Sequence, residues 1–314
     1  MPPKDTMQPL TATSLWGTWA PLLLPVNADD SIDYGRAREQ LERYGASGIQ
    51  GVYTNGTSGE FWAQSEAECD RLAALTAEVC AARGLAYQLG ASHPCPHTAL
   101  ERIRRARALA PGAIQVVLAD WWPVRLEDAI RCLTRFAEAA APVPLVLYNP
   151  PHAKRLLTPD EIRTLKTAVP ALVGFKGTQY DQLLPAGIPG MALFAGGRVL
   201  ADAWAKGARG SYSEVACMNP WGAARWYRLM ERDLPAAQEI GRRLTAWRSR
   251  HIVPLNQQLG FAGPFNDKLF AAIGDWAPIG TRMRWPYLGV APELAAQLRP
   301  AARAEVPEIF AAQP

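Results

Sequence analysis

Apolar and polar positions follow two different periods along the first two thirds of the chain. Short apolar runs, typical of buried strands, are each followed by a segment whose apolar residues recur at intervals of three and four, as in residues 31–47 and 65–84. The clearest helix start lies at Thr158, which can cap the helix, with Pro159 at its first position. Strands are therefore expected at eight places, in GTWAPLLLPV, GIQGVYTNG, AYQLGAS, AIQVVLAD, PLVLYNPP, ALVGFKG, MALFAGG and GARGSYSEVA.

Eight βα units within roughly 220 residues have the size of a (β/α)8 barrel, whose active site lies at the C-terminal ends of the strands. The predicted fold class is therefore α/β, a (β/α)8 TIM barrel with a C-terminal helical extension. A doubly wound sheet is the alternative, but no GxGxxG motif follows the first expected strand. Beyond residue 220 the periodicity is purely helical. Residues 1–220 are expected to form the barrel that carries the active site, and residues 221–314 a helical region.

Composition and charge narrow the classes of function. The chain has 314 residues, of which 49% are hydrophobic and 20% charged, as in a globular protein. The net charge is +4, and the densest basic run, RIRRAR at residues 102–107, fits the solvated face of a helix better than a nucleic-acid-binding surface. Residues 1–10 lack the apolar centre of a signal sequence, and no stretch approaches the ~18 apolar residues that a membrane span needs. We expect a cytoplasmic protein with no nucleic-acid and no membrane partner.

The segment SHPCPH raises the question of a metal site, because it brings His93, Cys95 and His97 close together. Two prolines stiffen the segment, no CxxC motif occurs in the chain, and no second group of ligands is evident. An ordinary loop is therefore favoured, and no metal is expected.

Small residues follow the second expected strand, in the sequence TNGTSGE. Gly56 and Gly59 allow the backbone to turn tightly, and Thr57 and Ser58 present hydroxyls beside unpaired N–H groups. Such a turn can hold a carboxylate without an arginine. Taken alone, the same composition also fits a plain turn.

Two further side chains with possible chemistry end the fifth and sixth strands. Tyr148 stands before two prolines, where it can transfer a proton or line a pocket rim. Lys176 ends the apolar run ALVGFKG, and a buried ammonium is costly unless it is paired or deprotonated. A neutral lysine amine can attack a carbonyl group and form an imine. Taken alone, such a lysine also fits a surface group that extends into solvent.

Together these motifs resemble those of the dihydrodipicolinate synthase/N-acetylneuraminate lyase family of Schiff-base-forming aldolases. GTSGE, YNPP and GFKG occur in the family's order and spacing, and RWPYLGV at residues 284–290 resembles its C-terminal motif. The resemblance implies an imine on Lys176 with no other cofactor and no metal. It also implies a proton shuttle at Tyr148, a catalytic Thr57, and a homodimer or homotetramer. The substrate-binding residues it implies are Gly56, Thr57, Ser58 and Tyr212.

Three departures from the family pattern bear on the substrate. Ala153 replaces the arginine that follows the tyrosine motif in the synthases, and Trp121 and Trp122 replace a tyrosine pair of the relay. After the seventh strand, Gly197 and Arg198 stand where the lyases carry an acidic pair. Neither synthesis of the lysine precursor nor cleavage of N-acetylneuraminate is therefore expected.

Arg198 and Trp122 are included among the candidate substrate contacts. Arg198 can pair with a carboxylate or a backbone carbonyl, or else cap the following helix. Trp122 would give the pocket a flat apolar wall for a bulky substrate.

Two hypotheses of function follow. The first is a lyase, either an aldolase or a dehydratase, that binds pyruvate or a 2-keto-3-deoxy acid as an imine. The second is a barrel that keeps the 2-oxo acid pocket as a binding or regulatory module without turnover. The set formed by Thr57, Tyr148 and Lys176 favours the first hypothesis, and the altered relay favours the second.

Overall fold

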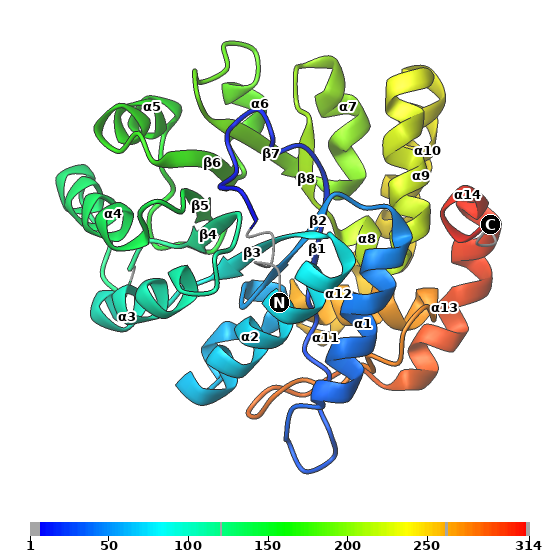
Figure 1. Ribbon diagram of the computed structural model, residues 1–314. Helices are drawn as coiled ribbons and strands as arrows, with labels where there is room; N and C mark the ends of the chain where they lie inside the picture. The colour runs from blue at the N-terminus through cyan, green and yellow to red at the C-terminus, as the bar shows by residue number, and fades with distance from the viewer. Residues whose placement is uncertain (1–6, 120, 261–262, 312–314) are drawn as a thin grey trace.

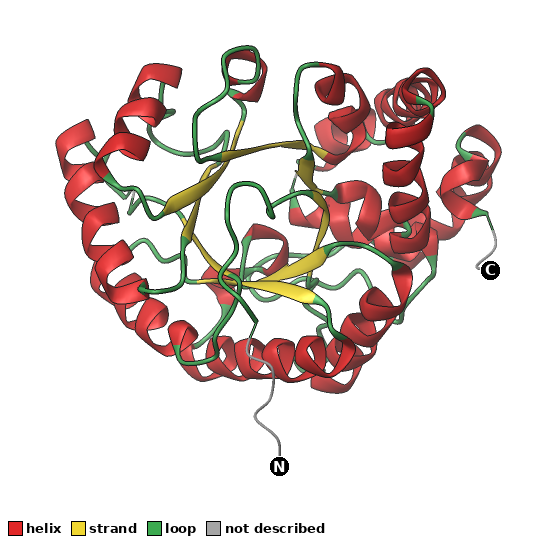
Figure 2. Ribbon diagram, turned by 45° about the horizontal axis from the view of Figure 1, so that its top comes forward, coloured by secondary structure: helices red, strands yellow, loops and turns green. Residues whose placement is uncertain are grey.

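The computed structural model describes residues 7–119, 121–260 and 263–311. In this part of the chain eight parallel strands close into a barrel, in which each strand pairs with the next and β8 with β1. Figure 2 shows the strands in yellow inside a ring of red helices. All eight predicted strands form, and the predicted (β/α)8 barrel is confirmed. Their bounds are β1 Gly17–Pro21, β2 Gly51–Thr54, β3 Ala86–Gly90, β4 Ala113–Val116, β5 Leu145–Asn149, β6 Leu172–Gly177, β7 Ala192–Gly196 and β8 Gly210–Tyr212.

Helices surround the strands, and their ends follow the local sequence signals. Thr158 caps α5 as predicted: its hydroxyl accepts from the Glu161 N–H at 3.3 Å, and the Glu161 carboxylate accepts from the Thr158 N–H at 2.9 Å. The bounds are α1 Tyr34–Ser47, α2 Glu66–Arg83, α3 Pro96–Arg107, α4 Leu126–Ala140, α5 Pro159–Ala168, α6 Tyr180–Leu183, α7 Leu200–Ala205 and α8 Glu214–Met218, with short 3-10 turns η1 Thr57–Gly59, η2 Phe61–Ala63 and η3 Gly197–Val199.

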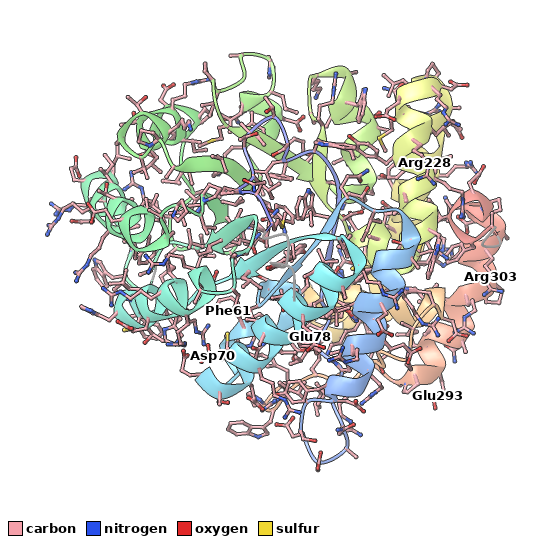
Figure 3. The ribbon with its side chains drawn as sticks, viewed as in Figure 1. Phe61, Asp70, Glu78, Arg228, Glu293 and Arg303 are labelled. Atoms are coloured by element: carbon pink, nitrogen blue, oxygen red, sulfur yellow. The ribbon has the colours of Figure 1, made fainter. Side chains whose placement is uncertain are left out.

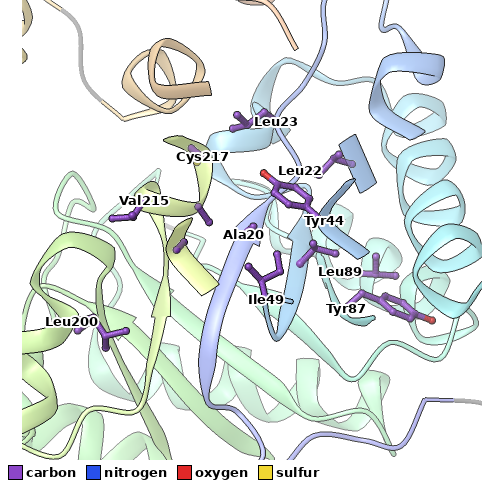
Figure 4. Packing of buried hydrophobic residues seen from close by; sticks show 14 of the residues in the cluster. Ala20, Leu22, Leu23, Tyr44, Ile49, Tyr87, Leu89, Leu200, Val215 and Cys217 are labelled. Atoms are coloured by element: carbon purple, nitrogen blue, oxygen red, sulfur yellow. The ribbon is translucent and has the colours of Figure 1, made fainter. Parts of the chain in front are cut away.

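Two apolar layers hold the barrel together. The larger layer lies between strands and helices; Figure 4 shows part of it, where Tyr44 packs near Ala20 and Leu22. A smaller cluster, containing Trp19 and Phe194, is formed by residues of the strands and of the segment before β1. Alternation along each strand sends side chains to both layers, so every strand is buried on two faces.

Beyond β8 the described chain forms helices, as predicted, but residues 275–291, between α12 and α13, are not helical. The segment 234–260 contains two helices, because Ile252 separates α10 from α11. The helix α10 packs against α9, α7 and η3, and α12 packs against α8 and η1, so both reach the C-terminal ends of the strands (Figure 1). The bounds are α9 Pro220–Arg232, α10 Leu234–His251, α11 Val253–Leu259, α12 Pro264–Gly274, α13 Pro292–Glu305 and α14 Pro307–Phe310.

Charged side chains cover the outer helices, as Figure 3 shows for Asp70 and Glu78. The basic run at residues 102–107 lies on α3, but it is not fully solvated: Arg102 is buried and pairs with Glu66 at 2.7 Å, and Arg105 pairs with Asp70 at 2.8 Å. These arginines therefore join α3 to α2. Across the described ranges, no helix combines the length and the apolar character needed to cross a membrane.

Candidate active site

A cavity of about 490 Å³ lies at the C-terminal ends of the strands. Its volume falls within the range of ligand-binding pockets, and this end of the barrel is where (β/α)8 enzymes carry their active sites. Residues of the strand ends, of α10 and of α12 form its wall. The polar and charged ones include Tyr53, Thr57, Ser58, Gln115, Tyr148, Lys176, Thr178, Tyr180, Arg198, Tyr212, Glu214, Arg248, Asn266 and Asp267.

Lys176 lies among three tyrosine rings. Its Nζ is 4.4 Å from the ring centroid of Tyr148, 4.8 Å from that of Tyr212 and 5.5 Å from that of Tyr53. The strand register sets the first of these contacts, because Tyr148 and Lys176 are paired residues of β5 and β6. The structure thus brings three of the predicted residues to one place.

Burial lowers the pKa of Lys176 from 10.5 to about 8. The carboxylates of Asp267 and then Glu214 act in the opposite direction, since they favour the ammonium form. At neutral pH this shift raises the fraction of free amine roughly 300-fold over an ordinary lysine. The amine is therefore available as a nucleophile, and it faces an open cavity.

Tyr148 keeps its proton over the whole physiological range. Burial raises the pKa of Tyr148 to about 12, and the charge of Asp267 adds to this effect. A hydrogen bond with the Thr57 side chain acts the other way. A protonated phenol next to the amine can donate a proton to a departing hydroxyl, or relay it through Thr57.

The turn after β2 has the form expected of an anion-binding loop. In the described structure neither the Thr57 N–H nor the Ser58 N–H has a backbone acceptor. Gly56 precedes them and does not line the cavity itself. A Cβ at Gly56 would lie 3.1 Å from the Gln115 side chain and 3.1 Å from the Tyr53 ring, so a larger residue would push cavity-lining groups aside.

A buried ion pair fixes this turn to α12. Lys268 Nζ lies 2.5 Å from Glu60 Oε1, and both side chains are fully buried. The same ammonium donates to the Arg282 carbonyl at 2.5 Å, and the Arg284 N–H donates to Glu60 Oε2 at 2.9 Å. The two bonds made by Glu60 join residues more than 200 positions apart, and they hold η1 against the helix that carries Asp267.

Asp267 is a cavity residue that the sequence did not reveal. Ser58 Oγ donates to Asp267 Oδ2 at 2.5 Å, so the hydroxyl predicted to bind a substrate carboxylate already has a protein partner. Burial raises the pKa of Asp267 to about 6, although the Ser58 hydrogen bond lowers it. A second carboxylate entering this turn must therefore share Ser58 with Asp267 or take its place.

Arg198 lies in the cavity wall and pairs with Glu214. Its Nη1 is 3.0 Å from Glu214 Oε1, and Glu214 Oε2 accepts from the Gly197 N–H at 2.8 Å. The arginine is thus paired with a carboxylate, one of the roles considered from the sequence, and Glu214 also caps η3. Tyr212 lines the floor of the cavity, where its hydroxyl donates to Gln88 at 2.5 Å.

Trp122 does not lie where a pocket wall was expected. The exposed fraction is 79% for Trp122 and also for Trp121, and neither lines the cavity. Both rings lie largely in solvent, so the apolar wall predicted from Trp122 is absent from the cavity in the described chain.

Arg155, two residues after Ala153, does not replace the arginine that the synthases carry at position 153. Arg155 donates to the Val124 carbonyl at 2.6 Å and also pairs with Glu161, so it is held outside the cavity.

In the SHPCPH segment, Cys95 caps α3 and its N–H donates to His93 Nδ1 at 2.9 Å. Over the described ranges, no group of three His, Cys, Asp or Glu is arranged to hold a metal ion.

Several polar residues of the cavity wall are not among those expected from the sequence. Glu214 could have been found, because it follows β8 at the same level as the other strand ends. No such signal marks Arg248, Asn266 and Asp267. They lie on C-terminal helices, and a local sequence pattern does not show which helices pack against the barrel mouth.

Comparison with known proteins identifies relatives over most of the chain. Residues 14–256 match the Dihydrodipicolinate synthetase family. The N-acetylneuraminate lyase of Escherichia coli O1:K1 / APEC is 28% identical over 238 residues, which cover 73% of this chain and 79% of that protein.

Two solved structures share the fold. One is a prophage protein of the dihydrodipicolinic acid synthase family from E. coli K12 in complex with pyruvate, with a TM-score of 0.79, 19% identity, and coverage of 92% of this chain and 98% of that chain. The other is a catalytic lysine mutant of the Ruminococcus gnavus sialic acid aldolase, with a TM-score of 0.80, 17% identity, and coverage of 96% and 100%.

Proposed function

Since the chain belongs to the dihydrodipicolinate synthetase family, we propose that it is a lyase that binds a 2-oxo acid as an imine on Lys176. The predicted family is confirmed by this match. The substrate class is pyruvate or a 2-keto-3-deoxy acid. The proposal rests on the position of Lys176. Its amine, whose pKa is lowered, lies among tyrosine rings and in the same cavity as the turn after β2.

The proposed reaction begins at the 2-oxo carbon. The neutral Lys176 amine attacks this carbon and forms a C–N bond, and the carbonyl oxygen leaves as water after protonation. The resulting iminium withdraws electrons from the bond between the third and fourth carbons of the substrate, or from a C–H bond of the third carbon, in which case the enamine so formed then expels the hydroxyl of the fourth carbon as water. Breaking either bond leaves an enamine rather than a free carbanion, which lowers the barrier.

Tyr148 and the turn after β2 have separate tasks in this scheme. Tyr148 donates the proton that the oxygen needs as it leaves, and it takes up the proton released when the imine is hydrolysed. The substrate carboxylate lies against the free N–H groups of Thr57 and Ser58. No cofactor other than the covalent imine enters the scheme, and the protein is expected to act as a homodimer or homotetramer.

One observation favours the alternative of a 2-oxo acid-binding module without turnover. Ser58 is hydrogen-bonded to Asp267, which is a feature of a site that is not fully prepared for the substrate carboxylate. Both proposals include a pocket for a 2-oxo acid, and they differ in whether any carbon–carbon or carbon–oxygen bond of the bound acid is broken.

A substrate screen separates the two. Pyruvate is incubated with a panel of aldehydes, and 2-keto-3-deoxy acids are followed for pyruvate release and for water loss. Turnover in any arm that is lost in Lys176→Met supports the lyase. An adduct on Lys176 with pyruvate, combined with no turnover in every arm, supports the binding module.

A further inference from the structure

Arg248 differs from the other arginines of α10 in its partners. Arg242 pairs with Glu239, Arg243 with Glu308 and Arg250 with Glu305, all on the outer surface of the molecule. Arg248 instead lines the cavity, and within the described chain its guanidinium has no hydrogen-bond or ion-pair partner. A half-buried guanidinium of this kind retains its charge and its five donors.

The surroundings of Arg248 do not neutralise it. Burial lowers the pKa of Arg248, and the positive charge of Arg198 lowers it further. The carboxylates of Glu214 and Asp267 act in the opposite direction without offsetting these effects. Glu214 is bound to Arg198 and to the Gly197 N–H, and Asp267 is bound to Ser58, so neither carboxylate is in contact with Arg248.

The position of Arg248 separates it from the carboxylate-binding turn. The helix α10 packs against η3, at the end of β7, whereas the turn at Thr57 follows β2. In the closed barrel these two strands are separated by β8 and β1, and Lys176 on β6 lies next to β7. The cavity of about 490 Å³ leaves room beyond a three-carbon 2-oxo acid for a longer substrate.

We propose that Arg248 binds a second anionic group, a carboxylate or a phosphate, at the end of the substrate remote from the one held by the turn after β2. The inference rests on the proposed function for the identity of the 2-oxo end. It narrows the substrate to a 2-oxo acid with an anion at each end, because an unpaired guanidinium in a cavity is best satisfied by a bidentate oxyanion.

Calorimetric binding of acids without a 2-oxo group tests this subsite separately from the imine. Succinate, glutarate and adipate are compared with monocarboxylic acids of the same chain lengths, and 4-phosphonobutanoate is compared with glutarate. For at least one diacid or for the phosphonate, we expect binding about tenfold tighter than that of the matched monoacid. The tighter of glutarate and 4-phosphonobutanoate identifies the distal group as carboxylate or phosphate.

Substitutions test whether the preference for diacids depends on Arg248. In Arg248→Gln the ratio of monoacid to diacid dissociation constants should fall to about one, and Arg248→Lys should restore part of it. Arg242→Gln is the matched control on the same helix, since Arg242 is exposed and pairs with Glu239, and it should keep the wild-type ratio. A wild type without preference, or a preference that survives in Arg248→Gln, overturns the inference.

Trapping of pyruvate with borohydride in the same preparations distinguishes the two proposals. A lysine adduct without any diacid preference leaves the lyase standing and removes the Arg248 subsite. A diacid preference that depends on Arg248, without any adduct, removes the lyase mechanism and keeps the subsite. The absence of both results overturns both proposals.

Discussion

Single residues in the cavity derive their chemistry from their neighbours. Lys176 is a strand-end lysine whose pKa of about 8 results from burial, while two carboxylates partly restore its charge. Tyr148 remains a phenol because burial and the same Asp267 disfavour the phenolate. At pH 7 Tyr148 is therefore a proton donor, and about a tenth of the Lys176 side chains carry the free amine that imine formation requires.

Removal of one hydroxyl tests the role of Tyr148. Tyr148→Phe keeps the ring beside Lys176 and removes the proton donor. We expect turnover of a cleaved substrate to fall about 10²–10⁴-fold, with a much smaller change in pyruvate affinity, because proton transfer acts mainly in the transition state. Steady-state kinetics and pyruvate titration provide the comparison. If Tyr148→Phe kept nearly full turnover, Tyr148 would be only a wall of the cavity.

Asp267→Asn should change the pH dependence of imine formation. The Asp267 carboxylate raises the pKa of Lys176, so its removal should lower that pKa and move the midpoint of borohydride trapping to lower pH. The measurement is the initial rate of trapping between pH 6 and about 10. Asp275→Asn is the control, because Asp275 is an exposed residue at the end of α12 and does not line the cavity.

The same substitution has a predicted effect on stability. The pKa of Asp267 is raised to about 6 in the folded protein, so the folded state binds this proton more tightly than the unfolded chain does. The free energy of unfolding that this group adds to the wild type is fully present below pH 3.8, the ordinary pKa of an aspartate, and it is lost as the pH rises to about 6. Asp267→Asn should therefore unfold at a higher temperature than wild type at pH 8 and near the same temperature at low pH. The opposite order at pH 8 would contradict the assignment.

Elements far apart in sequence meet at the cavity through a few buried contacts. The turn η1 belongs to the second βα unit and α12 to the C-terminal region, and the Glu60–Lys268 pair joins them where neither side chain is accessible to solvent. Burying two charges is costly unless the pair and its hydrogen bonds are complete. The precise position of the turn after β2 therefore depends on the C-terminal helices.

Breaking this ion pair should be far more costly than breaking a surface one. Lys268→Met leaves the Glu60 carboxylate buried without its cation, and the expected loss is about 3–5 kcal/mol of unfolding free energy. The exposed Lys206–Asp181 pair is the control, with an expected loss of about 0–1 kcal/mol in Lys206→Met. Denaturant unfolding measures both. Adding Glu60→Gln to Lys268→Met should recover part of the stability, and equal small losses for the two pairs would refute the account.

The regular elements could be predicted from the sequence, but the cavity wall could be predicted only in part. Strand periodicity and motif order are local, so β2, β5 and β6 and the residues Thr57, Tyr148 and Lys176 were found. Asp267 was not, because its contact with Ser58 joins positions 209 residues apart. The prediction that Trp122 forms a wall of the cavity was wrong, because the position of a residue in a motif fixes neither the direction of its loop nor the exposure of its side chain.

At the scale of the whole molecule, large apolar side chains remain exposed. The exposed fraction is 79% for Trp121, Trp122 and Trp285 and 82% for Leu288. Large apolar groups on a surface often mark contacts between subunits. The homo-oligomer expected from the sequence remains a prediction: light scattering coupled to size exclusion should give two or four times the chain mass of 34.3 kDa. A mass equal to one chain would contradict it.

Reductive trapping of pyruvate tests the central claim most directly. The protein is incubated with pyruvate and borohydride, and the modified residue is located by intact mass and peptide mapping, with Lys176→Arg as the control. A single stable adduct on Lys176 that is absent from Lys176→Arg is the predicted result. An adduct on another lysine, or no adduct at saturating pyruvate, would contradict the account.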